Sequence, residues 1–340
     1  MEQVNNAEST VTAIEKVEEV KTESPKQAKK KMSKKRKKEL IFVAILLAYP
    51  VIQFLLTWIF VNSYSIILAF ENVSLEGKVT FAGLKNFIDI FKQFDINYGG
   101  GIDLGNGTRL SYNLMIVINS FAYGIITIFI SLPLALICSY FLSKKMPLAN
   151  VFRVIFFLPN IISVVALVYA FKMQTVDSSA GLIYHFLSAL GMKVNIDTWP
   201  NTTLIVLVYC IWAGLGYNVL LLSGAIGRIP NELFESAQMD GASSFKQFTK
   251  IMIPMVWPTV VTLVVLGLTS ILTLYLQPVL FDLNNNETIA GTIFNGVSGS
   301  GSKTMYPYYA AFGLLFSFVL APAILYIRKV ISRKYSDTDC

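Results

Sequence analysis

The 340-residue sequence contains few of the residues that build metal centres and disulfide frameworks. It has one histidine, His185, and three scattered cysteines, Cys138, Cys210 and Cys340, without CxxC spacing. We therefore predict no metal site and no disulfide framework. Because no acidic or cysteine residues cluster beside His185, the sequence does not favour a catalytic role for it. Charge is scarce too, since 14% of the residues are charged and 54% are hydrophobic.

Such an excess of apolar residues cannot be hidden inside one soluble globule, so it predicts a polytopic membrane protein. Apolar stretches long enough to cross a hydrocarbon core of about 30 Å occur six times. They cover residues 40–60, with an extension toward residue 70, and residues 114–142, 154–171, 204–222, 259–280 and 308–327. The expected fold is an all-α membrane protein with six transmembrane helices.

The basic residues predict the orientation. Six spans place both termini on one side of the membrane, and Lys and Arg gather in the loops and tails of that side. By the positive-inside rule this side is the cytoplasm. The same distribution accounts for the net charge of +7, so nucleic acid is not implied as a partner.

The distribution of charged and apolar residues divides the chain into three expected segments. Residues 1–38 begin acidic and end in a lysine-rich run, and no small-residue cleavage site follows the next apolar run, so we do not expect them to be a signal peptide. We expect a disordered cytoplasmic tail whose lysines set topology and can attract anionic membrane lipid. Residues 39–334 form the six-helix domain, and residues 335–340 form a short C-terminal tail.

The predicted spans hold almost no Lys, Arg, Asp or Glu, which disfavours a proton-driven or ion-driven carrier. They carry amides and aromatic rings, which suit a sugar, because rings cover its C–H face and amides pair with its hydroxyls. The predicted pathway residues are Asn119, Tyr123, Tyr209, Trp212, Tyr217, Asn218, Tyr275 and Gln277, with Ser120 and Asn160 as further polar residues. The alternative is that the amides join helices and that the aromatics lie at the membrane interface.

The pathway candidates on the fourth span lie on different faces of the helix. Tyr209 and Trp212 share one helix face, whereas Asn218 points roughly the other way unless Gly214 and Gly216 let the helix unwind. Gly214, Gly216 and Gly224 could also allow close helix packing. Pro133, Pro159 and Pro322 could act as hinges.

A polar island at residues 229–258 interrupts the apolar runs. Pro230 and the early carboxylates predict a short helix, and Gly241 permits a sharp turn after it. Asp240 or Ser243 can cap a second short helix, and Pro254 marks the return to the membrane. The expected structure is a helix-turn-helix at the membrane surface.

The segments Glu235-Ser236-Ala237, Gly241 and Ile251-Met252-Ile253-Pro254 resemble the EAA loop of ABC importer permeases. That loop has the pattern EAA, three residues, G, nine residues and I-x-L-P. The spacing matches throughout, although Ser236 replaces the first alanine and Ile253 replaces leucine. The segment 81–87, FAGLKNF, resembles an element of sugar-importer permeases, and the resemblance covers about residues 40–334.

The resemblance implies a type I ABC importer permease fold in a prokaryotic cell membrane, with loop 229–258 as the cytoplasmic coupling loop. Glu235 would contact the ATPase and Gly241 would form the bend. The coupling residues would be Glu235, Ser236, Ala237, Asp240, Gly241, Ala242, Ile251 and Pro254. The implied partners are a second homologous permease, two copies of an ABC ATPase and an extracellular or periplasmic solute-binding protein.

We expect no enzyme activity and no cofactor in this chain. The glycine-rich stretch 296–304 fails the P-loop spacing, because Ser302 separates Gly301 from Lys303, so ATP and Mg²⁺ would bind the partner ATPase. The expected cargo is an oligosaccharide. The alternatives are glycerol phosphate, an acidic oligosaccharide, an amino acid or an ion as cargo, an ion-coupled carrier or channel, and a membrane scaffold without a pathway.

Overall fold

The computed structural model describes residues 34–104, 108–144, 146–175, 181–189, 199–282, 285–299 and 302–333. The chain divides into two units, Met1–Asn62 and Ser63–Cys340. The described part of the first unit belongs to helix α2 (Lys34–Ala69), which continues into the second. Residues 34–38 are therefore helical, so the expected tail of residues 1–38 is too long. Lysine is a good helix former, which lets the helix begin before its apolar part. Residues 1–33 and 335–340 lie outside the described residues.

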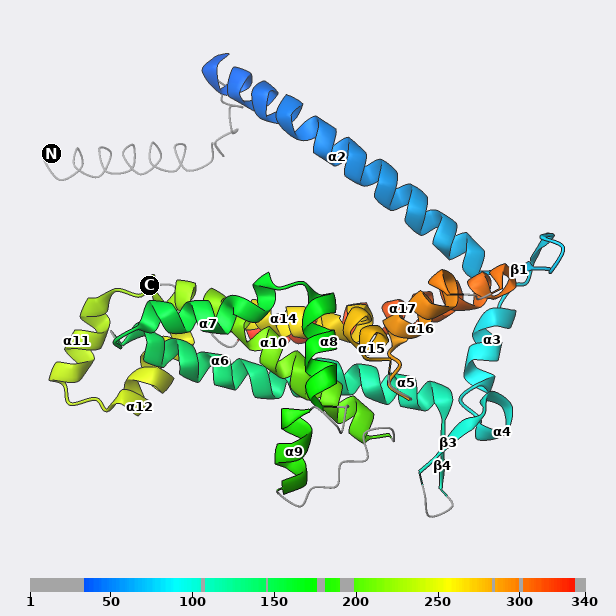
Figure 1. The fold of residues 1–340 in the computed structure, drawn as a ribbon. Coiled ribbons are helices and arrows are strands. Elements are labelled where there is room, and N and C mark those ends of the chain that lie inside the picture. Colours follow the sequence, from blue (N-terminus) through cyan, green and yellow to red (C-terminus); the bar gives the residue numbers. More distant parts are fainter. Residues whose placement is uncertain are drawn as a thin grey trace, which may run out of the picture. The chain divides into compact units, whose positions relative to one another are not determined.

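The described part of the chain is mainly helical, as predicted (Figure 1). Four helical stretches are long and apolar enough to cross a membrane singly: Lys37–Ala69, Tyr112–Ser143, Asn201–Ile226 and Lys303–Arg333. The last three comprise α5 (Tyr112–Phe121), π-helical η1 (Ala122–Ile126), α6 (Thr127–Ser143), α10 (Asn201–Ile226), η3 (Lys303–Met305) and α17 (Tyr306–Arg333). Two helix pairs, each bent at a break, bring the number of spans to six if each pair is one span.

The third predicted span is not one straight helix. α7 (Ala149–Ile161) and α8 (Val164–Thr175) meet at 98°, and Ile162 between them has an extended backbone. The prediction of a continuous helix over residues 154–171 is therefore wrong. A hydropathy pattern does not show where a helix axis changes direction. A signal for the break is nevertheless present, because Ser163 is of a residue type favoured just before the start of a helix.

The fifth predicted span ends early. α14 (Trp257–Thr273) stops before the extended residue Leu274, and the short α15 (Leu276–Phe281) follows. The Leu274 carbonyl accepts a hydrogen bond from Thr288 Oγ1 at 2.7 Å, which replaces a lost helical bond. At its other end α14 meets the helix Ser244–Met255 at 72°. That helix consists of α12 (Ser244–Gln247), π-helical η2 (Phe248–Met252) and α13 (Ile253–Met255).

Small elements connect the first two spans. β1 (Glu71–Val73) pairs antiparallel with β2 (Val79–Phe81), and β3 (Gly101–Asp103) pairs with β4 (Arg109–Ser111). The helices α3 (Lys85–Lys92), α4 (Ile96–Gly99), α9 (Leu182–Ala189) and α16 (Ile289–Ser298) complete the short elements on the predicted outer side. Asn86, in the segment 81–87, donates from Nδ2 to the carbonyls of Ala69 and Glu71, both at 2.9 Å. These two hydrogen bonds therefore connect the start of α3 to the end of α2 and to β1.

Buried apolar clusters join the helices of the second unit. One cluster joins α6, α10 and α14 to the loop 229–256, and another joins η1, α8, α10 and α15. α10 crosses α7 so closely that a Cβ at Gly216 would lie 1.8 Å from the Phe156 carbonyl oxygen. Gly214 and Gly224 have no such neighbour within 4 Å, so of the three glycines only Gly216 makes the predicted close contact. In Figure 1, α11 (Asn231–Met239) and α12 lie at the opposite end of this unit from α3 and α4.

Candidate functional site

Helix α11 ends in a turn that requires a residue in the left-handed region. The Ala242 N–H donates to the Ala237 carbonyl at 2.9 Å, and the Gly241 N–H donates to the Gln238 carbonyl at 3.0 Å. These two bonds form a Schellman motif, and Gly241 has a φ of +75°. Glycine adopts this angle without a Cβ penalty. The predicted bend at Gly241 is confirmed.

The second helix of the loop begins at a side-chain cap. Ser243 Oγ accepts from the Lys246 N–H at 3.4 Å, so Ser243 is the N-cap rather than Asp240. The buried Gln247 donates from Nε2 to the Ala242 carbonyl at 3.1 Å. These contacts hold the turn and the second helix in one arrangement.

Residues at the end of α6 hold this second helix. The Tyr140 hydroxyl donates to the Ser244 carbonyl at 2.8 Å, and Lys144 Nζ donates to Ser244 Oγ at 2.7 Å. The rings of Tyr140 and Phe248 lie 5.2 Å apart. A displacement of the loop would therefore be passed to the second span.

The tip of the loop is exposed. Met239 is 88% exposed and Phe245 is 74% exposed, which is unusual for large apolar side chains. Glu235, Ser236 and Asp240 are exposed as well. The other predicted coupling residues, Ala237, Ala242, Ile251 and Pro254, are partly buried. An exposed apolar surface with carboxylates beside it is typical of a protein interaction site.

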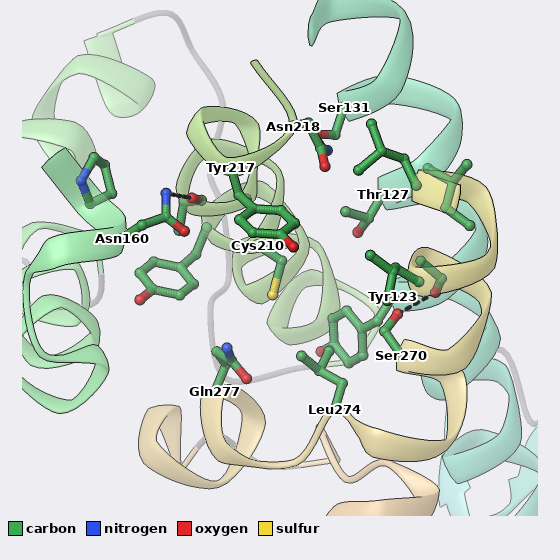
Figure 2. Close-up of a pocket in the computed structure, with 18 of the residues that line it drawn as sticks. Tyr123, Thr127, Ser131, Asn160, Cys210, Tyr217, Asn218, Ser270, Leu274 and Gln277 are labelled. Atoms are coloured by element: carbon green, nitrogen blue, oxygen red, sulfur yellow. Dashed lines mark hydrogen bonds between the residues drawn. The ribbon is translucent and has the colours of Figure 1, made fainter. Parts of the chain in front are cut away.

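A cavity of about 390 Å³ lies among the middle parts of the spans (Figure 2). Its wall comes from η1, α6, α7, α8, α10, α14 and α15 and from the break between α7 and α8. The polar side chains that line it are Tyr123, Thr127, Ser131, Asn160, Tyr209, Tyr217, Asn218, Ser270 and Gln277. Among the described residues that form this wall, none is Asp, Glu, Lys or Arg. Tyr123 and Tyr209 are 1% exposed, whereas Tyr217 and Leu266 are 45% and 48% exposed.

Five of the eight predicted pathway residues line this cavity: Tyr123, Tyr209, Tyr217, Asn218 and Gln277. Asn218 donates from Nδ2 to Ser131 Oγ at 2.9 Å. α10 is one continuous helix, so the expectation that Asn218 needs an unwound helix is wrong. The cavity extends around half of α10, since nine residues turn a helix by about 180° from Tyr209 to Asn218.

Asn119 lies outside the cavity wall and is fully buried. Its Nδ2 donates to the carbonyls of Asn285 at 3.1 Å and Glu287 at 3.0 Å. Its Oδ1 accepts from Trp199 Nε1 at 3.0 Å and Thr203 Oγ1 at 2.8 Å. All the hydrogen-bonding groups of the side chain are thus paired with protein. Asn119 therefore joins α5 to the segment 285–287 and to the start of α10, and it does not line the cavity.

Two predicted aromatic residues also miss the cavity. The Trp212 ring stacks on Phe171 at a centroid distance of 6.0 Å, and the Tyr275 ring packs 4.8 Å from Phe294. Trp212 lies 300° around α10 from Tyr209, that is, about 60° away on the side opposite to Tyr217. Trp212 and Tyr275 therefore do not line this cavity, and each ring packs against another aromatic ring.

The sequence reasoning missed several lining residues, chiefly Thr127, Ser131, Cys210 and Ser270. A usable signal was present in the second span, because Tyr123, Thr127 and Ser131 recur every four residues on one face. Thr127 Oγ1 is buried and has no hydrogen-bond partner in the described structure. Its hydroxyl is available for a bound molecule that supplies the missing partner.

Up to six apolar spans, a polar cavity whose described wall comes from the second to fifth of them and holds no charged group, and an exposed loop at one end are features of a multi-pass membrane transport protein. The model of one family, described as binding-protein-dependent transport system inner membrane component, matches residues 107–337. This match covers more than half of the chain. The chain belongs to that family.

Relatives agree with this assignment. The probable ABC transporter permease protein YurN of Bacillus subtilis is 28% identical over 225 residues, which are 62% of this chain and 70% of YurN. The arabinooligosaccharides transport system permease protein AraP of the same species is 24% identical over 216 residues, which are 62% of each chain, so less than two thirds of AraP is matched. One chain of a bacterial ABC transporter for the acidic polysaccharide alginate has the same fold. It superposes with a TM-score of 0.68 at 20% identity, covering 88% of this chain and 98% of that chain.

Proposed function

We propose that this chain is one permease subunit of an ATP-driven importer for a largely neutral oligosaccharide. The observation that carries the proposal is the mid-span cavity, whose polar groups are hydroxyls and amides and whose aromatic rings are tyrosines. Hydroxyls and amides match the hydrogen-bonding groups of a sugar, and the rings can cover its apolar face. A charged cargo would favour a cation in the wall.

The proposed partners are inferred from the exposed side of the cavity and the exposed tip of the loop. The cavity is exposed at Tyr217 and Leu266, where a second homologous permease would complete the wall. Of two copies of an ABC ATPase, one would dock on the exposed Met239, Phe245 and Glu235 of this chain, and the other would dock on the partner permease. The family is binding-protein-dependent, so an extracellular or periplasmic solute-binding protein would deliver the cargo. The arabinooligosaccharide relative supports the sugar class.

The proposed orientation places the loop 229–258 and both termini in the cytoplasm of a prokaryotic cell. A cysteine replacing the exposed Lys250 should therefore react only in inverted vesicles, and one replacing the exposed Ser74 should react in intact cells. The measurement is labelling by a membrane-impermeant maleimide in a chain whose three native cysteines are replaced. The reversed pattern at both positions would overturn the orientation.

The cargo prediction concerns two aromatic residues of α10. Tyr217→Ala should lower the affinity for a neutral oligosaccharide about tenfold, because it removes a ring and a hydroxyl from the cavity wall. The measurement is uptake by the assembled transporter, recorded as KM and maximal rate over neutral and uronic-acid oligosaccharides. Basal ATP turnover should remain.

Trp212→Ala is the matched control for this variant. Trp212 and Tyr217 lie on the same helix and are equally exposed, at 45%, but Trp212 is outside the cavity. Its removal should leave KM unchanged. An unchanged KM for Tyr217→Ala would move the binding site elsewhere. A preference for uronic-acid oligosaccharides would reject the neutral cargo.

A further inference from the structure

A buried polar layer closes one end of the cavity. The Tyr123 hydroxyl donates to Asn286 Oδ1, and Asn286 Nδ2 donates to the Pro278 carbonyl at 3.1 Å. Tyr123 and Asn286 are each 1% exposed. Tyr123 lines the cavity itself, and Figure 2 shows it with Leu274 and Gln277 at the end opposite Asn218 and Ser131.

The same layer attaches the segment after α15 to the second span. Asn119 holds the carbonyls of Asn285 and Glu287, and Ser120 Oγ accepts from the Ile289 N–H at 2.8 Å. These bonds and that of Tyr123 all start from one face of α5 and η1, which lies on the predicted outer half of the span. These contacts between the two segments are hydrogen bonds, and among the described residues no ion pair joins the segments.

Tyr123 and Asn286 lie between two hollow spaces. The large cavity has Tyr123 in its wall, and a smaller hollow of about 50 Å³ is lined by Asn286, Pro278 and Asn295 together with the carboxyl residues Asp282 and Glu287. The hydrogen-bonded pair therefore forms a partition between the cavity and the predicted outer side. Tyr123 lies in the π-helical turn η1, and such turns often accompany functional sites, where a change of helical register moves a side chain.

We propose that the Tyr123–Asn286 hydrogen bond is the outer gate of the transport pathway, made while the cavity is shut from outside and broken when cargo enters. The chemistry suits repeated opening. A bond between neutral groups exchanges with water or with a sugar hydroxyl at a small net change in free energy, whereas a buried ion pair broken in the same place leaves uncompensated charges. This gate rests on the proposed import function and orientation.

Cys210 supplies a native reporter for the gate. It lines the cavity, and Figure 2 shows its sulfur pointing into it. In a Cys138→Ala/Cys340→Ala chain within the complete transporter, the rate of Cys210 modification by a membrane-impermeant cationic methanethiosulfonate would be measured in intact cells and in inverted vesicles. Tyr123→Phe should raise the rate from outside about fivefold or more, because the closed state then holds an acceptor without its donor.

Two further variants separate gating from general loosening. Tyr169→Phe removes a hydroxyl from a residue of α8 that is 51% exposed and lies outside the cavity wall, so it should leave the labelling rate unchanged. Asn286→Ala should raise it like Tyr123→Phe, and the double variant should add nothing more, because both single changes remove one bond.

Each outcome of these labelling experiments either supports or overturns the gate assignment. Unchanged labelling from outside in assembled Tyr123→Phe and Asn286→Ala transporters would overturn the gate, as would a matching rise for Tyr169→Phe. If neither variant assembles, the pair is a fold contact and the gate assignment is rejected. A rise seen only in inverted vesicles would keep the gate but reject the proposed orientation.

Discussion

A valine at position 241 should abolish cargo uptake while leaving the chain in the membrane. A Cβ at Gly241 would meet nothing within 4 Å, so the penalty comes from the backbone and not from a clash. The φ of +75° is one that β-branched residues resist, and the left-handed conformation costs an ordinary residue about 1–2 kcal/mol. Loss of the bend would release both hydrogen bonds of the Schellman motif and move Met239 relative to Phe245.

Asparagine is the matched control, because it tolerates the left-handed region. Gly241→Asn should retain most of the uptake and should bind the ATPase as the native chain does. The measurements are uptake, the amount of chain in the membrane and the ATPase recovered with it on purification. Normal uptake and ATPase recovery for Gly241→Val would show that the bend has no part in coupling.

This loop could be predicted from sequence because its structure is local. The turn depends on one glycine, one serine cap and the spacing between them, and all of these lie within a few residues. The sequence left open whether Asp240 or Ser243 caps the second helix, since both are suitable types. Nor could it show that Tyr140 and Lys144 hold the loop, because those contacts join segments about a hundred residues apart in sequence.

The cavity was less predictable because it depends on how each helix is rotated. Asn119 and Asn218 are the same residue type in similar apolar surroundings, yet Asn119 has all its bonds within the protein and Asn218 lines the cavity. Composition cannot separate them. The break at Ile162 also escaped the hydropathy pattern, although it places Asn160 and Ile162 in the cavity wall.

Gly216→Ala should disturb both stability and transport, since α7 and α10 touch through their backbones at this point. The added Cβ would lie 1.8 Å from the Phe156 carbonyl oxygen and 3.0 Å from Phe157 Cα, so no side-chain rotation relieves the clash. Overpacking of this kind costs about 1–3 kcal/mol. We expect a lower Tm for the purified transporter.

The same displacement should reach the cavity, because it acts on the helix that carries Asn160. Asn160 donates from Nδ2 to the Ala213 carbonyl at 3.0 Å, one turn before Gly216 on α10. Pushing α7 away would stretch this bond and widen the wall, so KM should rise together with the fall in Tm. Gly224→Ala adds the same methyl group to the same helix, outside the cavity wall and where nothing lies within 4 Å, and it should leave both unchanged. Equal effects of the two substitutions would mean that α10 is sensitive to any added methyl group and that the crossing with α7 does not shape the cavity.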